Sequence, residues 1–353
     1  MIRRISRAVR VGDVTIGAGS PVSIQSMTNT YTRDVDQTVK QIEALVDAGC
    51  EIVRLAVPDS ASAQALGIIK KRVKIPVVAD IHYDYRLALE SLKAGADKLR
   101  LNPGNIGGAD KVKAVAREAA SRGVPIRVGV NSGSLEKDLF AKYGGVTPEA
   151  LVESALRSVE ILENQSFKDI VIAVKSSDVT LSVSAYELLA KHTDYPFHVG
   201  ITEAGTVYGG SIKSAVGIGA VLSRGLGDTI RVSLTGDPLE EVRCAREILQ
   251  SLGLRRFGVE LVSCPTCGRT SIDLIGLAER IEAYCKDIKT PLKVAVMGCV
   301  VNGPGESKDA DIGVTGGDGK GVIFKKGEIF ATMKEDELFP AFVQELEKMV
   351  GVT

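Results

Sequence analysis

The chain has 353 residues, of which 44 % are hydrophobic and 25 % charged, a composition typical of globular proteins with about two domains. Its 44 basic and 44 acidic residues cancel, which argues against a broad nucleic-acid-binding surface. No apolar run approaches the roughly 18 residues of a membrane-spanning helix, so we expect no membrane association.

The first residues are basic, but no apolar stretch follows them, so we expect no signal peptide and a cytoplasmic protein. In that reducing compartment, the 6 cysteines indicate metal binding, catalysis or burial rather than disulfides. Cys50 and Cys244 fall in helical patterns and are expected in the core. Cys285 ends a predicted helix and is expected to pack rather than to bind a metal.

Residues 8–19 are predicted to form a hairpin, with its turn at Gly12-Asp13 and apolar residues alternating around it. Short β-rich runs then alternate with helical patterns of a dozen or more residues. The eight runs cover residues 22–25, 52–56, 77–81, 98–101, 126–130, 170–174, 198–201 and 230–234. Several helical patterns end in glycine, for example at Gly49 and Gly123, as expected where a helix turns back into a strand.

Eight βα units in about 250 residues predict an α/β fold of the (β/α)8 TIM-barrel type over residues 1–253. An open, doubly wound sheet is the alternative, but no glycine-rich dinucleotide motif follows the first strand. Residues 254–353 are predicted to form a small α+β domain, with strands at 257–262, 292–296, 312–314 and 322–324 and helices at 272–285 and 335–349.

The carboxyl ends of the predicted barrel strands carry a set of cations, and catalytic residues of TIM barrels lie at that face. The set comprises Arg54, Arg100, Arg127 and Lys175. Because guanidinium groups match phosphate oxygens, these residues predict a phosphate or diphosphate ligand. Glu203 and His82 are the candidates for proton transfer. The simpler interpretation is that each cation pairs with an acid and that His82 is satisfied by neighbouring Asp80.

The second predicted domain contains Cys264 and Cys267 in a Cys-x-x-Cys pair, followed by Cys299 on a Gly/Pro-rich loop. Three thiolates suit an iron–sulfur cluster or zinc, and a disulfide between the paired cysteines or idle thiols remain alternatives. Glu306 lies seven positions after Cys299 on the same loop. A cluster with one such non-thiolate ligand has a labile iron that can bind a substrate.

The whole chain resembles the 4-hydroxy-3-methylbut-2-enyl diphosphate synthase family of the non-mevalonate isoprenoid pathway, in its short two-domain bacterial form. The resemblance rests on the motifs SIQSMTNT at 23–30, KLRLNPGN at 98–105, RVGVN at 127–131, GITEAG at 200–205, GDTIRVSL at 227–234, SCPTCGR at 263–269 and MGCVVNGPGE at 297–306.

The resemblance implies reductive ring opening of 2-C-methyl-D-erythritol 2,4-cyclodiphosphate, with two electrons and loss of water. It implies a [4Fe-4S] cluster held by Cys264, Cys267, Cys299 and Glu306, with Glu306 giving way to a substrate oxygen. It further implies a homodimer, in which the cluster domain of one subunit caps the barrel of the other, and electrons from reduced flavodoxin or ferredoxin.

The residues are then expected to divide into two groups. Those that bind substrate are Arg54, Arg100, Arg127, Asn131, Lys175 and Ser233, and those that act in catalysis are Glu203, His82 and Asn302. Two other functions stay open at this point. One is a barrel aldolase or isomerase of a phosphorylated substrate, with Lys175 forming a Schiff base and a structural metal domain. The other is an electron-transfer protein without a substrate.

Overall fold

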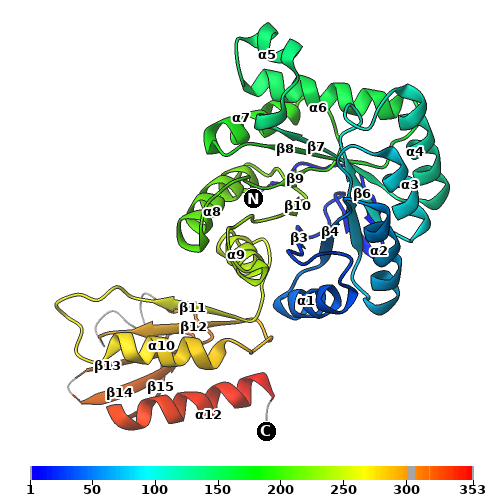
Figure 1. Cartoon of the computed structure of the whole chain (residues 1–353). Helices are drawn as coiled ribbons and strands as arrows, with labels where there is room; N and C mark the ends of the chain where they lie inside the picture. The colour runs from blue at the N-terminus through cyan, green and yellow to red at the C-terminus, as the bar shows by residue number, and fades with distance from the viewer. Residues whose placement is uncertain (1, 300–306, 318, 352–353) are drawn as a thin grey trace. The chain divides into compact units, whose positions relative to one another are not determined.

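The computed structural model describes residues 2–299, 307–317 and 319–351. The chain divides into two compact units, Met1–Arg255 and Arg256–Thr353 (Figure 1). Within the described part of the chain, none of the helices combines the length and the apolar character needed to cross a membrane.

The first unit contains a ring of eight parallel strands. These are β3 (Ser23–Met27), β4 (Ile52–Ala56), β5 (Val77–Asp80), β6 (Lys98–Leu101), β7 (Ile126–Asn131), β8 (Ile170–Lys175), β9 (His198–Val199) and β10 (Thr229–Ile230). They pair in the order β8-β7-β6-β5-β4-β3-β10-β9. A parallel bridge between Ile172 and Phe197 brings the segment before β9 beside β8. The sheet is therefore a nearly closed barrel, which confirms the predicted TIM-barrel fold.

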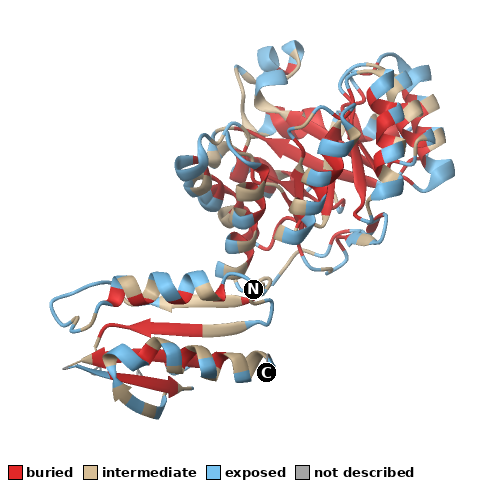
Figure 2. Cartoon of the chain, turned by 60° about the horizontal axis from the view of Figure 1, so that its bottom comes forward, coloured by how far each residue is buried: buried red, intermediate tan, exposed pale blue. Residues whose placement is uncertain are grey.

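Helices surround this sheet and expose one face to solvent while the strands are buried (Figure 2). They are α1 (Val35–Ala48), α2 (Ser60–Arg72), α3 (Tyr85–Lys93), α4 (Ala109–Arg122), α6 (Pro148–Glu163), α7 (Val179–Leu189), α8 (Val207–Ser223) and α9 (Pro238–Ser251). A short 3-10 helix η1 (Ser132–Ser134) and helix α5 (Lys137–Tyr143) interrupt the connection from β7 to α6. Gly49 and Gly123 end their helices in the left-handed conformation, as the sequence indicated.

An apolar hairpin closes the amino-terminal end of the barrel. Its strands are β1 (Val9–Val11) and β2 (Val14–Ile16), which pair antiparallel as predicted. The buried side chains of the hairpin form one cluster with residues at the start of three barrel strands; the cluster comprises Val9, Val11, Ile16, Ile52, Val78 and Val171. The polar interior above this cluster is thus separated from solvent on one side.

Strands β9 and β10 have two residues each and are shorter than predicted. The backbone after β10 forms different hydrogen bonds from those of a regular barrel strand. The Arg231 N–H still donates to the Val199 carbonyl, but the Leu234 N–H donates to the carboxylate of Glu241 at 3.1 Å. At Leu234, a side chain on α9 therefore replaces the neighbouring strand as the hydrogen-bond partner.

The second unit is a five-stranded sheet with helices packed on it. Its strands are β11 (Val259–Ser263), β12 (Leu292–Met297), β13 (Ile312–Gly317), β14 (Lys320–Lys325) and β15 (Glu328–Lys334), in the order β11-β12-β13-β14-β15. The helices are α10 (Leu274–Cys285), the 3-10 helix η2 (Glu335–Glu337) and α12 (Leu338–Val350). Strand β15 was not predicted, because an edge strand with exposed Ile329 and Phe330 lacks the alternation of a half-buried strand.

The close pairing of β13 with β14 depends on a glycine. A β-carbon at Gly313 would lie 2.2 Å from Cζ of Phe324, its fully buried partner on β14. We predict that Gly313→Ala destabilises the second unit by about 1–3 kcal/mol through overpacking. Hydrogen exchange of strands β13 and β14 measures this loss.

The matched control is Gly219→Ala in helix α8, where nothing lies within 4 Å of the new methyl group. Because alanine favours a helix over glycine, that variant should be neutral or slightly more stable. Unchanged protection of β13 in Gly313→Ala would show that Phe324 has room to move aside.

Candidate active site and candidate metal centre

The barrel brings four of the predicted cations into its interior. Arg54, Arg100, Arg127 and Lys175 lie on β4, β6, β7 and β8. Arg100 and Arg127 are register partners on adjacent strands. Arg54 and Arg100 both contribute to lowering the pKa values of Arg127 and Lys175, as expected for cations that lie in one region.

One carboxylate, Asp80 at the end of β5, serves two of these arginines. Its oxygens lie 3.7 Å from Nε of Arg54 and 3.3 Å from Nη1 of Arg100. Nε2 of His82 lies 3.5 Å from the same carboxylate, whereas the rest of the His82 side chain is exposed. The pair predicted between His82 and Asp80 is therefore present, and it leaves the ring accessible from outside.

The pKa values around Asp80 follow from this pairing. Burial alone raises the pKa of Asp80, but Arg54, the His82 hydrogen bond and Arg100 together hold it well below its ordinary value. Its stabilising contribution is therefore fully present at neutral pH and is lost only in acid, as the pH falls from the ordinary carboxylate range towards the lowered pKa. Burial lowers the pKa of Arg54 to about 10, against the opposing effect of Asp80.

Arg127 and Lys175 differ from the first two cations in having no carboxylate of their own. Both are buried, and neither forms an ion pair among residues 2–299, 307–317 and 319–351. Nε and Nη1 of Arg127 also have no hydrogen-bond partner there. Burial and then the neighbouring cations lower the pKa of Lys175 well below its ordinary value. Arg127 and Lys175 therefore have N–H groups available to bind an anion.

Sequence reasoning missed two residues of this region, Arg231 and Glu241. Arg231 follows β10 and donates to Glu241 from Nη2 at 3.2 Å. Glu241 is buried on α9 and also accepts from the Ser26 hydroxyl at 3.0 Å. Arg231 could have been found, because it precedes the predicted Ser233 by two positions and shares its strand face. Glu241 could not, because nothing in a helical pattern distinguishes a carboxylate that turns inward.

Ser233 itself lies on the irregular segment after β10, partly exposed. Its neighbour Leu234 and the nearby Arg231 are both bonded to Glu241. Glu241 thus fixes the backbone on which Ser233 is carried.

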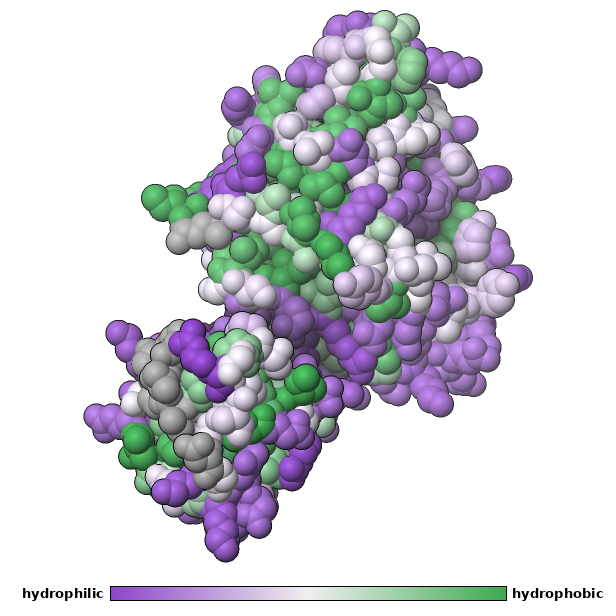
Figure 3. Space-filling model, turned by 90° about the vertical axis from the view of Figure 1, so that its left-hand side faces the viewer, coloured by the Kyte–Doolittle hydropathy of each residue, from purple (hydrophilic) through white to green (hydrophobic). Residues whose placement is uncertain are grey.

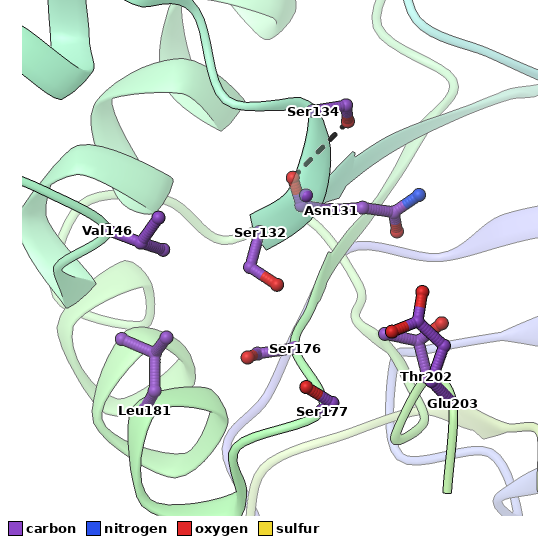
Figure 4. A pocket seen from close by; sticks show the side chains of 10 residues that line it. Asn131, Ser132, Ser134, Val146, Ser176, Ser177, Leu181, Thr202 and Glu203 are labelled. Atoms are coloured by element: carbon purple, nitrogen blue, oxygen red, sulfur yellow. Dashed lines mark hydrogen bonds between the residues drawn. The ribbon is translucent and has the colours of Figure 1, made fainter.

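A pocket of about 530 Å³ opens between the loops that follow β7, β8 and β9. Its lining includes none of the four cations, although Lys175 directly precedes Ser176 on its wall. Hydroxyl groups line much of it, and Glu203 and Thr202 lie across it from Val146 and Leu181 (Figure 4). Its lining includes Asn131, Ser132, Gly133, Ser134, Val146, Ser176, Ser177, Leu181, Thr202 and Glu203. Two of the predicted site residues, Asn131 and Glu203, therefore belong to one pocket.

The backbone of Glu203 is strained, with φ at +53°, in the left-handed region that non-glycine residues rarely adopt. Strain of this kind persists where the surrounding structure imposes it, and it is concentrated at functional sites. It directs an exposed carboxylate towards the hydroxyl-lined pocket.

In the second unit the three predicted thiols lie at or beyond strand ends. Cys264 directly follows β11, Cys267 lies on the loop beyond it, and Cys299 follows the adjacent β12. In the part of the chain that the structure describes, no three Cys, His, Asp or Glu side chains are grouped as metal ligands. Glu306 and Asn302 lie outside the described residues.

Contacts nevertheless join the two cysteine loops. The Gly298 N–H donates to Sγ of Cys264 at 3.1 Å, and the Thr315 hydroxyl donates to the Cys299 carbonyl at 2.8 Å. A β-carbon at Gly298 would lie 3.2 Å from the side chain of Thr270, whose hydroxyl accepts the Cys267 N–H at 3.1 Å. Backbone N–H donation from Arg269 lowers the pKa of the exposed Cys267 thiol. A free thiol set with backbone donors to sulfur fits iron–sulfur ligation.

The other cysteines are placed differently. Cys285 is buried in the α10 core of the second unit, where burial raises its pKa to about 11. Cys50 is buried as expected but follows helix α1 rather than lying within it, and Cys244 on α9 is only partly buried.

Comparisons with known proteins cover both units. A profile of the GcpE TIM-barrel domain matches residues 6–246, and one of the GcpE protein C-terminal domain matches residues 260–348. Similar proteins include the 4-hydroxy-3-methylbut-2-en-1-yl diphosphate synthase (flavodoxin) of Caldanaerobacter subterraneus subsp. tengcongensis, 58 % identical over 99 % of this chain and 98 % of that one. The Clostridium acetobutylicum protein of the same name is 57 % identical over 99 % of this chain and 100 % of its own length.

Solved structures with a similar fold include more distant proteins. Dihydropteroate synthase from Stenotrophomonas maltophilia matches with a TM-score of 0.53 and 13 % identity, covering 70 % of this chain and 98 % of that one. The 3-dehydroquinate dehydratase from Geobacillus kaustophilus matches with a TM-score of 0.50 and 17 % identity over the same shares. At these identities the likeness shows the barrel fold alone.

Fold and site together define a TIM-barrel enzyme with a cationic strand-end site and a cysteine-bearing α+β domain. The chain belongs to the GcpE family, the oxidoreductases known as 4-hydroxy-3-methylbut-2-en-1-yl diphosphate synthases.

The role of Asp80 as shared counter-ion can be tested by Asp80→Asn. Removing the carboxylate leaves Arg54 and Arg100 buried beside each other, and we expect a loss of about 3 kcal/mol in the ligand-free protein. Saturating inorganic pyrophosphate should restore part of it. Thermal unfolding with and without pyrophosphate measures both effects.

Asp36→Asn is the control, because Asp36 pairs with Arg72 on the surface and should change little. Equal melting temperatures for the wild type and Asp80→Asn without ligand would contradict the counter-ion role.

Proposed function

We propose that this chain catalyses the reductive ring opening of 2-C-methyl-D-erythritol 2,4-cyclodiphosphate. The reaction consumes two electrons and two protons and yields 4-hydroxy-3-methylbut-2-enyl diphosphate and water. The observation that carries the proposal is the cation set of the barrel interior, with Arg127 and Lys175 buried, in a chain 58 % identical to a protein named for this product.

The substrate-binding residues of the proposal are Arg54, Arg100, Arg127, Asn131, Lys175 and Ser233. Two phosphoryl groups need several donors, and Arg127 and Lys175 have no carboxylate to compete with them among the described residues. Among the described residues, Arg54 and Arg100 share the carboxylate of Asp80, Arg54 also donates to Sδ of Met27, and Nε of Arg100 has no hydrogen-bond partner. Asn131 at the pocket wall and Ser233 after β10 would then hydrogen-bond to the sugar-derived carbon chain or the phosphate.

Glu203 is proposed to protonate the departing oxygen, because its carboxylate reaches the pocket formed by the loops that follow β7, β8 and β9. His82 is proposed as a second proton donor, held in place by Asp80 while its ring stays exposed. Asn302 is proposed to position the substrate from the loop after Cys299, outside the described residues.

A [4Fe-4S] cluster is proposed as the cofactor, held by Cys264, Cys267, Cys299 and Glu306. When bound, it supplies the two electrons of the reaction. Two observations support this assignment. The Gly298 N–H donates a hydrogen bond to Sγ of Cys264, and Gly298 lies close to the side chain of Thr270 on the other cysteine loop. The proposal thus divides the chain at 253/254, with substrate bound by the barrel and the cluster by the second domain.

Reduced flavodoxin or ferredoxin is the proposed electron donor, and the relatives carry flavodoxin in their names. A reducing cytoplasm is the proposed location. We also propose a homodimer. Helix α8 supports it, because Val207, Tyr208, Ile212 and Val216 are exposed on that helix. Hydrophobic side chains gather on the corresponding face of the barrel in Figure 3.

Turnover of the anaerobically reconstituted protein with reduced flavodoxin and the cyclic diphosphate tests the function directly. We predict that Glu203→Gln lowers kcat by about 100-fold, because a proton donor is lost, and leaves KM little changed. Glu187→Gln on α7 is the control, since Glu187 is half-exposed and pairs with Arg224 away from the pocket. Near-normal turnover of Glu203→Gln would exclude the assigned role.

Iron analysis tests the ligand assignment without turnover. We predict about four irons per chain in the wild type, and loss of the cluster in Cys267→Ser, because a hydroxyl is a poor iron ligand. Cys285→Ser should retain its iron, since Cys285 is buried in the core. Loss of iron in both variants, or in neither, would contradict the assignment.

A further inference from the structure

Lys98 is a buried lysine that the proposed reaction does not use. It is the first residue of β6 and has no exposed surface. Its Nζ donates to Oε1 of Gln25 on β3 at 3.2 Å. In the described part of the chain it forms no ion pair, although buried lysines are almost always paired with a carboxylate.

The surroundings of Lys98 form a buried polar layer below the cation set. Several polar atoms in this interior have no hydrogen-bond partner among the described residues; they include Ser23 Oγ, Gln25 Nε2, Thr229 Oγ1 and both ring nitrogens of His198. Ser23 pairs in register with Thr229, and Thr229 with His198, so three of these residues form one row across β3, β10 and β9. The apolar hairpin cluster closes the barrel beneath them.

The charged and titratable groups that face this layer are almost all cationic. Arg127 of β7 and Arg54 of β4 act on Lys98 directly, and Lys98 in turn acts on His198 of β9. The carboxylate on neighbouring β5, Asp80, is engaged by Arg54, Arg100 and His82. Burial, then Arg127 and Arg54, lower the pKa of Lys98 well below its ordinary value. In the free protein, protonation of Lys98 is therefore unfavourable.

Gln25, the hydrogen-bond partner of Lys98, can accommodate both the charged and the neutral form of the lysine. The amide of Gln25 can accept from an ammonium through Oε1 or donate to a neutral amine through Nε2, whereas a carboxylate would hold the lysine charged. A diphosphate bound by the cations above brings negative charge into the same low-dielectric interior, where it acts strongly on neighbouring groups.

We propose that Lys98 takes up a proton from solvent when the diphosphate group of the substrate binds to the cations of the barrel. The step converts the neutral amine to an ammonium ion and transfers no other atom or electron. It rests on the proposed function, because it needs that anion at that site. Lys98 does not touch the ligand in this proposal. It adds a positive charge to the barrel interior only when the bound diphosphate balances that charge.

Proton uptake has a definite consequence for affinity. If the complex holds one more proton than the separate partners, binding weakens as the pH rises. The slope approaches about tenfold per pH unit between the pKa of Lys98 in the free protein and its higher pKa in the complex. The cyclic diphosphate has only strongly acidic phosphoryl groups and stays fully ionised near neutral pH, so it contributes no proton of its own.

Isothermal titration calorimetry of the cluster-loaded, oxidised protein with the cyclic diphosphate measures the effect. No reductant is added, so binding occurs without turnover. Titrations in buffers with different ionisation enthalpies give the number of protons taken up per chain. We expect net uptake in the wild type and a Kd that rises with pH.

Lys98→Met removes the titrating group, and its uptake should fall by up to one proton per chain relative to the wild type. Gln25→Glu keeps the lysine but pairs it permanently with a carboxylate, so uptake should fall there as well. Lys93→Met is the matched control, because Lys93 at the end of α3 is exposed and its loss should leave uptake unchanged. Lys175 stays in all three variants, so the differences isolate Lys98.

Three results would overturn the proposal. Binding without proton uptake in the wild type refutes it and leaves the proposed function standing. Equal uptake in the wild type and Lys98→Met assigns the proton to another group, with Lys175 the next candidate. Absence of binding refutes both the inference and the proposed function. Should Lys98→Met fail to fold, the wild-type titrations and Gln25→Glu still decide the matter.

Discussion

The first unit is built around positive charge held inside a barrel with too few carboxylates to neutralise it. Asp80 is shared by Arg54 and Arg100, and Glu241 pairs with Arg231, while Arg127 and Lys175 have no acid of their own among the described residues. Burying unpaired charge is costly, so these cations lower the stability of the ligand-free protein. Their burial becomes favourable when an anion supplies the missing charge. The hairpin that seals the opposite end keeps the field from being screened by water.

The second unit carries Cys264, Cys267 and Cys299 on loops at or beyond the ends of β11 and β12, where the proposed function places the cluster ligands. Glycine is required where the segment before Cys299 passes Thr270 and helix α10. At Gly298 the chain passes so close to Thr270 and Leu274 that a side chain would crowd them, and the same residue donates its N–H to Cys264. The parallel pairing of β11 with β12 places Cys264 and Cys299 after neighbouring strands. Parallel strands and a glycine thus bring together cysteines that are far apart in sequence.

Most of the fold could be predicted from the sequence, because each barrel strand is a short β-rich run that is followed by a helical pattern. The cations on the barrel strands were also predictable, although Arg127 lies near the start of β7 and only Lys175 of the four ends its strand. Other features depend on three-dimensional packing. Glu241 turns inward from an ordinary amphipathic helix, and Lys98 at the start of a strand gives no sign of its burial. The short β9 and β10 follow from the carboxylate that captures Leu234, which no local pattern reveals. The roles assigned to the cysteines and to Glu203 remain predictions.

The same charge distribution explains why such a site would favour ring opening rather than merely hold the substrate. In the cyclic diphosphate, both phosphoryl groups are esterified to carbon. When the tertiary C–O bond breaks, negative charge develops on the freed phosphoryl oxygen. A site with buried, under-neutralised cations binds that developing charge more strongly than it binds the closed ring. Asp80 then matters for a second reason, because it orients Arg54 and Arg100 before the ligand arrives and leaves them little reorganisation to make. Under the proposed function, the unbalanced charge of the ligand-free barrel is thus complementary to the transition state before the substrate binds.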